Sequence, residues 1–235
     1  MSGGAHAMDE TIRNELFEKR EEKYKAFILK LTPTLKEEEV IGVRMPALRQ
    51  MAKKTAKQPD ALTLVAEPRY YEERMIEAIT VGYLKKNLAE KKDAVHGIVK
   101  KLDNWAICDS FCSTLKMKPE EKEAYFDFIK NYFLSGKEYE SRFAAVMSLN
   151  YFAEQPYMDR VLAHFEEINH QGYYVKMALA WAISVFYTKD PKKIENYLNK
   201  QTLDRFTHNK AIQKITESNR VTKEEKDHMR ELKRK

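Results

Sequence analysis

The feature of this sequence that most limits its fold is a set of apolar helical segments that recurs roughly every 30 to 38 residues. Each segment carries Ala and larger apolar residues at helical spacing, and between them lie more charged amphipathic stretches such as residues 120–134. A repeat of this length, made of paired helices, is typical of a HEAT-like α-solenoid. The six segments begin at Arg44, Arg74, Asn104, Arg142, Tyr174 and His208.

Glycine and proline divide the chain into short helical pieces, which we expect to be roughly ten to fifteen residues long. The sequence has only 7 Gly and 7 Pro, and strand-like alternation is nearly absent. We therefore predict an all-α fold, a HEAT-like α-solenoid of antiparallel helix pairs with a concave basic groove. In such a stack the N-terminal ends of successive helices line one wall, where helix dipoles and basic side chains favour phosphate. An ordinary helical bundle with coincidental spacing stays open as the alternative.

The ends of the chain and its apolar runs bear on domain organisation and location. Residues 1–7 look like a cloning remnant, and we expect residues 8–235 to form a single HEAT-like repeat domain. The longest purely apolar run, residues 177–187, is shorter than the roughly 20 residues that cross a bilayer, and no secretory signal is apparent. We expect a cytoplasmic, monomeric protein without a membrane partner. The basic run 230–235 is expected to be a frayed, solvated helix end.

The cysteines and histidines give no indication of a metal site. Cys108 and Cys112 are four residues apart, so a helix places them on one face, and two reduced buried thiols are the simplest interpretation. The six His do not cluster with them at a metal-binding spacing. We expect neither a metal nor a cofactor.

Candidate site residues stand at matched positions in consecutive segments: Trp105, Asp109, Arg142 and Trp181. Asp109 lies one helical turn after Trp105, inside an apolar stretch where a lone charge is costly and needs a partner or a purpose. One interpretation is an ion pair with Arg142 that joins two repeats. The other is a functional carboxylate beside an aromatic wall, with Arg142 orienting it or binding a phosphate.

The charge balance is modestly basic, with a formal net charge of +6, which does not by itself establish a nucleic-acid partner. The position of the basic residues matters more, because a basic face favours DNA over a peptide. The candidate DNA-binding residues are Arg44, Lys53, Arg74, Lys176, His208, Lys210, Lys214 and Arg220.

Four stretches and one single residue, in order along the chain, resemble the AlkD-type DNA alkylation repair proteins. They are residues 42–53, residues 103–109, Arg142, residues 173–181 and residues 208–214. The resemblance spans about Gly42 to Val221. It implies a HEAT-like helical solenoid that binds duplex DNA carrying alkylated bases. By position, the residues that line the family's lesion cleft look like Trp105, Trp181, Asp109 and Arg142. The implied reaction is hydrolysis of the N-glycosidic bond of N3- or N7-alkylated purines.

Two other functions are compatible with the same sequence. One is a catalytically inactive paralogue that binds distorted or branched DNA, since it would keep the same cleft residues. The other is a protein-binding scaffold, because α-solenoids often present concave surfaces to peptides.

Overall fold

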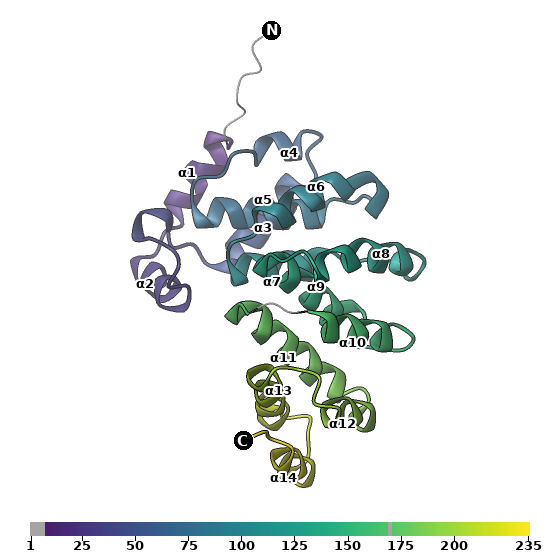
Figure 1. Ribbon diagram of the computed structural model, residues 1–235. Helices are drawn as coiled ribbons and strands as arrows, with labels where there is room; N and C mark the ends of the chain where they lie inside the picture. Colours follow the sequence, from purple (N-terminus) through teal and green to yellow (C-terminus); the bar gives the residue numbers. More distant parts are fainter. Residues whose placement is uncertain (1–7, 169–170) are drawn as a thin grey trace. The chain divides into compact units, whose positions relative to one another are not determined.

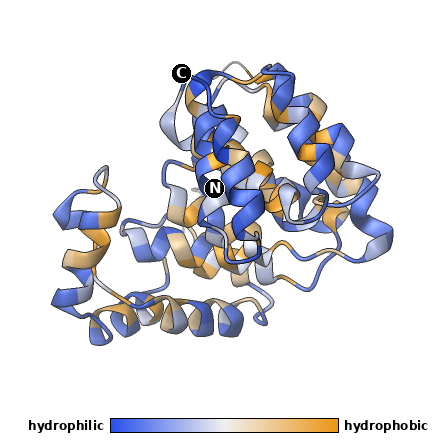
Figure 2. Ribbon diagram, turned by 90° about the horizontal axis from the view of Figure 1, so that it is seen from below, coloured by the Kyte–Doolittle hydropathy of each residue, from blue (hydrophilic) through white to orange (hydrophobic). Residues whose placement is uncertain are grey.

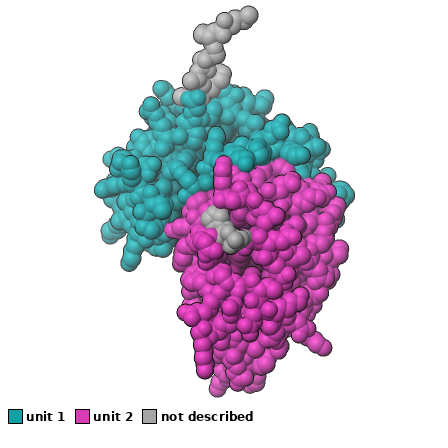
Figure 3. Space-filling model, viewed as in Figure 1, with its two compact units in different colours: residues 1–122 teal, residues 123–235 magenta. Residues whose placement is uncertain are grey.

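The computed structural model describes residues 8–168 and 171–235, so the predicted cloning remnant at residues 1–7 lies outside the described residues. In this part of the chain the regular structure is helical and no residue lies in a β-strand. The chain divides into two compact units, Met1–Lys122 and Glu123–Lys235, which Figure 3 colours separately. The all-α prediction is confirmed, and the single domain over residues 8–235 stays a prediction.

Unit 1 is built around α5, which packs against α3, α4, α6 and α7. Figure 1 shows these helices in purple to teal. The elements of unit 1 are α1 (Glu10–Glu18), α2 (Glu22–Leu31), η1 (Glu37–Glu39), α3 (Met45–Thr55), α4 (Ala61–Leu64), α5 (Tyr71–Tyr83), α6 (Leu88–Lys101), α7 (Trp105–Thr114) and η2 (Pro119–Glu121).

Unit 2 is built around α11, which packs against α9, α12 and α13, while α13 also packs against α14. Most of the α11 side chains are buried, as its long apolar run requires. Its helices are α8 (Lys122–Phe133, with Lys122 at the boundary), α9 (Glu138–Tyr151), α10 (Tyr157–Glu167), α11 (Tyr173–Tyr187), α12 (Pro191–Asn199), α13 (Arg205–Glu217) and α14 (Lys223–Glu231).

The six recurring segments are α3, α5, α7, α9, α11 and α13, which we call the recurring helices. Within each unit they pack on one another, and the longer helices between them, α6, α8, α10 and α12, bury apolar residues on part of their surface only. Figure 2 shows hydrophilic and hydrophobic residues mixed along the helices. Three of them begin earlier than the apolar pattern predicts, because their first turns are polar: α5 at Tyr71, α9 at Glu138 and α13 at Arg205. The alternation of two helix types is therefore present in both units.

A buried carboxylate orders the turn that leads into α3. The Glu72 side chain is fully buried and accepts hydrogen bonds from the backbone N–H groups of Ile41 (2.9 Å), Gly42 (2.7 Å) and Val43 (3.2 Å). Gly42 has φ +103°, and a Cβ there would lie 2.7 Å from the carbonyl oxygen of Glu21. The backbone of Gly42 therefore packs directly on the start of α2, and its carbonyl accepts the N–H of Glu21 (2.9 Å).

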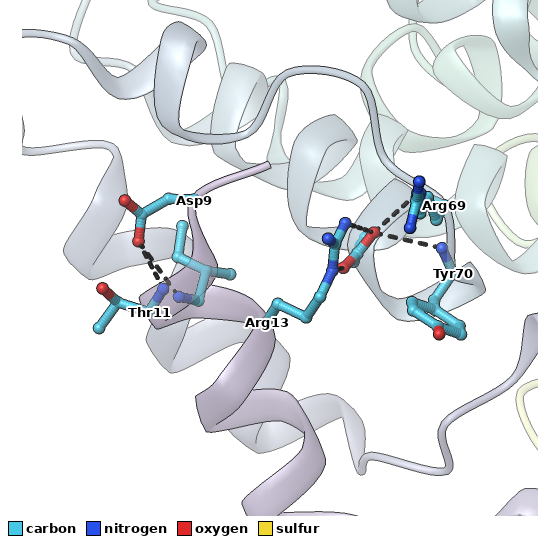
Figure 4. Close-up of polar contacts among 7 residues, drawn as sticks. Asp9, Thr11, Arg13, Arg69 and Tyr70 are labelled. Atoms are coloured by element: carbon cyan, nitrogen blue, oxygen red, sulfur yellow. Dashed lines mark hydrogen bonds and ion pairs between the residues drawn. The ribbon is translucent and has the colours of Figure 1, made fainter. Parts of the chain in front are cut away.

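The neighbouring carboxylate, Glu73, attaches α1 to α5. Its oxygens accept two hydrogen bonds from the Arg13 guanidinium, at 2.6 and 3.1 Å, and backbone N–H groups of Arg69 (2.7 Å) and Tyr70 (3.3 Å) (Figure 4). The hydrogen bond and charge of Glu73 outweigh burial and raise the pKa of Arg13. At the start of α1, Asp9 caps the helix by accepting the N–H of Thr11 at 2.9 Å.

The basic run 230–235 is largely exposed, as expected, but the expectation that it is frayed is wrong. After α14 the chain turns back onto α13, where the Asn209 amide donates to the carbonyl of Arg234 and accepts its N–H, both at 2.8 Å. The Arg234 guanidinium donates to the carbonyl of Leu203 at 2.6 Å, and His208 Nε2 lies 2.9 Å from the carbonyl oxygen of Leu232. Side chains of α13 supply bonds that a terminal segment cannot make by itself.

Replacing Gly42 with Ala tests the packing of this turn. We expect Gly42→Ala to lower the free energy of unfolding by at least about 2 kcal/mol, because the added Cβ meets backbone at a positive φ. Chemical denaturation measures the change. The control is Gly97→Ala inside α6, where a Cβ meets nothing within 4 Å and Ala should stabilise by about 0.5–1 kcal/mol. Equal effects of the two substitutions would contradict the role of Gly42.

Candidate functional site

A cavity of about 210 Å³ in unit 1 holds the first two candidate residues, Trp105 and Asp109. Both lie on α7, whose first turn is capped by Asn104: its side-chain oxygen accepts the N–H groups of Ala106 (2.8 Å) and Ile107 (3.3 Å). Both candidate side chains are half-buried, and the predicted single face is confirmed because both line this cavity. The lining residues are Tyr24, Phe27, Ile28, Leu31, Thr32, Met45, Tyr71, Met75, Trp105, Ala106, Asp109 and Ser110.

The opposite wall of this cavity is α2, which the sequence did not point to as part of a site. Trp105 Nε1 donates to the carbonyl of Leu31 at 3.3 Å, so the indole is held against the end of α2. The rings of Tyr24 and Phe27 stack with centroids 5.7 Å apart, and Phe27 is 52% exposed. The available signal was the spacing of Tyr24, Phe27, Ile28 and Leu31, which predicts one helix face.

Asp109 is the one carboxylate among the described residues that line this cavity. The other polar side-chain groups there are hydroxyls and the Trp105 indole N–H. Burial, followed by the charge of Glu72, raises the pKa of Tyr71 still further above neutral, so its hydroxyl stays protonated. A carboxylate among aromatic and aliphatic side chains attracts positive charge more strongly than it would in water. The cavity can therefore accommodate a cationic group next to aromatic faces.

A second cleft, of about 290 Å³, lies in unit 2 and brings together three predicted residues: Trp181, Lys214 and Arg220. Trp181 is half-buried on α11, Lys214 is on the neighbouring α13, and Arg220 is exposed in the segment that follows α13. Glu217 also lines this cleft and accepts a hydrogen bond from the Gln213 amide at 2.7 Å, so the two cations outnumber the one carboxylate. An indole face beside a net positive charge suits a phosphate or a nucleobase.

Arg142 is a buried side chain, 6% exposed, on α9. Its Nη1 donates to the carbonyl of Tyr174 at 2.7 Å, and the Glu138 carboxylate accepts the N–H of the same residue at 2.6 Å. Two side chains of α9 thus hold the first turn of α11 through its backbone.

The other predicted DNA-binding residues differ in what they already contact. Arg44 pairs with Glu21 and Arg74 with Asp103, both at 2.8 Å, and Lys176 lies 3.4 Å from Asp204. His208 is buried and holds Leu232. No ion pair occupies the remaining four in the described ranges: Lys53, which lies over the ring of Tyr83, Lys210, Lys214 and Arg220.

Comparison with known families identifies the class of protein. The family model of the DNA alkylation repair enzymes matches residues 9–215 of the 235, which include both cavities' tryptophans, Asp109 and Arg142. The chain belongs to the DNA alkylation repair enzyme family, and its role is in DNA repair. Comparisons with curated proteins and with solved structures found no match.

No helix within residues 8–168 and 171–235 is long and apolar enough to cross a membrane. In the same ranges, no group of three or more His, Cys, Asp or Glu side chains has a geometry that could hold a metal ion. Both cysteines are buried and neither is in a disulfide, as predicted.

The unpaired cations of the unit 2 cleft give a salt-dependence prediction. If they contact phosphates, Lys214→Ala and Arg220→Ala should each lower the slope of log K against log salt concentration by about 1 for duplex DNA. Titration by fluorescence anisotropy at several salt concentrations measures the slope. The charge-matched control is Lys193→Ala on α12, whose ammonium is paired with Asp159 at 2.6 Å. The control should leave the slope unchanged. A slope that Lys214→Ala and Arg220→Ala also leave unchanged would rule out phosphate contacts by these two residues.

Proposed function

We propose that this protein is a DNA glycosylase that hydrolyses the N-glycosidic bond of N3- or N7-alkylated purines in duplex DNA. The observation that carries the proposal is Asp109, a carboxylate beside Trp105 in an otherwise aromatic and aliphatic cavity, in a chain of the DNA alkylation repair enzyme family. The family match supports a role in DNA repair, and the cavity, with its carboxylate beside an aromatic ring, supports a reaction in which positive charge develops. The resemblance supplies the substrate class.

The chemistry explains why one carboxylate suffices. Glycoside hydrolases usually use two carboxyl groups. One is a general acid, because the leaving group needs a proton, and the other acts at the oxocarbenium-like sugar. An alkylated purine already carries a positive charge. When the C1′–N9 bond breaks, its electron pair neutralises the base, and positive charge develops on the deoxyribose. Water then adds to C1′, releases a proton and leaves an abasic site.

Asp109 is assigned to the developing charge on the sugar. An ionised carboxylate at this half-buried position beside an indole would stabilise an oxocarbenium-like state more than the ground state, which is the condition for catalysis. The Trp105 indole is held by Leu31 and adds a cation–π contribution to the same charge. The hydroxyl of Tyr71, being protonated, leaves Asp109 as the charged group of the lining.

Arg142 and Trp181 enter the proposal through the family resemblance. Trp181 offers a second aromatic face and Arg142 fixes the start of α11, which carries Trp181 two turns later. The candidate DNA-binding residues Arg44, Lys53, Arg74, Lys176, Lys210, Lys214 and Arg220 would bind the phosphate backbone, and His208 would act through the segment that it holds. A solenoid with a concave basic groove is the arrangement we propose for them.

Substituting Asp109 with Asn separates chemistry from structure. The change removes the charge and keeps the shape, so single-turnover release of methylated base should slow by about a hundredfold or more. Binding to an abasic-site duplex should change little, because that product lacks the developing cation. The control, Asp93→Asn on α6, removes the same charge from an exposed position in the same unit.

The same assay distinguishes the alternatives. A DNA-binding protein without catalytic activity would release no base above the spontaneous rate, which must be subtracted. Base release by the wild type that Asp109→Asn leaves unchanged would contradict the catalytic assignment. A structural role for Asp109 would instead lower thermal stability and every DNA-dependent property together.

A further inference from the structure

A row of four aromatic rings crosses the N-terminal ends of three recurring helices in unit 2. The rings belong to Tyr139 of α9, Tyr173 and Tyr174 of α11, and Phe206 of α13. Neighbouring centroids are 5.7 Å apart for Tyr139 and Tyr174, 5.3 Å for the two tyrosines of α11, and 6.0 Å for Tyr173 and Phe206. We call this row the aromatic ladder.

The outer end of the aromatic ladder is open to solvent. Tyr173 is 56% exposed and Phe206 is 40% exposed, and they are the exposed aromatic residues of unit 2 within its described part. Single exposed apolar side chains are common on proteins, but these two are in contact with each other. The row therefore forms a continuous aromatic surface.

The backbone under the aromatic ladder is firmly held. Arg142 and Glu138 bond the carbonyl and the N–H of Tyr174, so the ring positions at the start of α11 are tied to α9. Asp204 caps α13 by accepting the N–H groups of Phe206 (3.1 Å) and Thr207 (3.2 Å). A surface that is ordered before binding loses little conformational entropy when a ligand stacks on it.

The charges around the exposed rings favour an anionic ligand. The Lys210 ammonium lies 5.7 Å from the centre of the Phe206 ring and also donates a hydrogen bond to the Gln213 side-chain oxygen at 2.8 Å. Arg205, the residue before Phe206 in sequence, is exposed. In the described ranges neither cation is in an ion pair, whereas Asp204 is balanced by Lys176 at 3.4 Å. Burial raises the pKa of Asp204, and hydrogen bonds from Thr207 and the charge of Lys176 outweigh it, so this carboxylate stays ionised and paired.

We propose that the aromatic ladder binds unpaired DNA, with bases stacked on Tyr173 and Phe206 and phosphates next to Lys210 and Arg205. Exposed rings beside unpaired cations are the combination that binds single-stranded nucleic acid without sequence preference. Bases in a duplex hide their faces in the stack, so only an unpaired stretch can use such rings. The inference uses the family's link to DNA and is independent of base excision.

The test compares two single strands that carry the same phosphates. One is a labelled oligonucleotide of twelve thymidines, and the other is a chain of twelve abasic tetrahydrofuran nucleotides, which has no bases to stack. At low salt the full-length protein should bind the thymidine strand at least about tenfold more tightly. Equal affinity for the two strands would mean phosphate attraction alone and would overturn the proposal.

Variants then locate the binding. Tyr173→Ala with Phe206→Ala should abolish the preference for the thymidine strand, whereas Tyr173→Phe and Phe206→Tyr, which keep the aromatic faces, should retain it. Phe206→Leu, apolar but without a π face, should lose part of it. The control is Leu134→Ala, since Leu134 is an exposed apolar residue of the same unit that is not one of the four rings. A preference that survives the double alanine variant would overturn the assignment to this surface.

The outcome is separable from that of the glycosylase proposal. Base release from a blunt methylated duplex should be unchanged in the double alanine variant, because the duplex offers no unpaired bases to these rings. Loss of base release together with the thymidine preference would show that the rings serve the excision site instead, which would also overturn the proposal. Circular dichroism confirms that each variant is folded.

Discussion

The candidate cavity of unit 1 depends on one buried carboxylate. Glu72 satisfies three consecutive backbone N–H groups in the turn before α3, which would otherwise be buried without partners. That turn presents Gly42 to the start of α2, and α2 in turn supplies the wall opposite Asp109. This turn, the Arg44–Glu21 ion pair and the Trp105–Leu31 hydrogen bond therefore all help to hold α2 in position.

Much of the fold was predictable from the sequence, because apolar periodicity and helix-breaking residues carry it. Trp105 and Asp109 could be placed on one face, since a spacing of four residues is one helical turn. The roles of Glu72 and Glu73 could not be predicted, since two adjacent glutamates at the start of a helix usually face solvent. The backbone groups that Glu72 binds are 29 to 31 residues away in sequence and Arg13 is 60 residues from Glu73, and no local pattern reports such contacts.

The basic residues show a second limit of sequence reasoning. Charge and position alone do not distinguish Lys214, which has no ion pair in the described part of the chain, from Arg44, which is bound to Glu21. Side-chain geometry decides which cations are available to phosphate, because a paired guanidinium must break its pair to bind another anion. The same geometry shows that the basic C-terminal segment is attached to α13 by Asn209 and His208.

Arg142 has a position that changes how its substitution should be interpreted. Its guanidinium holds the carbonyl of Tyr174, in the first turn of the helix that carries both Tyr173 and Trp181. Removing it would leave that carbonyl without its partner and loosen the start of α11, so the aromatic ladder and the unit 2 cleft would both be affected. A loss of DNA affinity in an Arg142 variant therefore does not by itself identify a phosphate contact. A loosened start of α11 would weaken both the salt-dependent binding at the cleft and the preference for bases at the aromatic ladder, whereas a lost phosphate contact would weaken only the salt-dependent binding. Measuring the salt slope and the preference for bases therefore distinguishes the two causes.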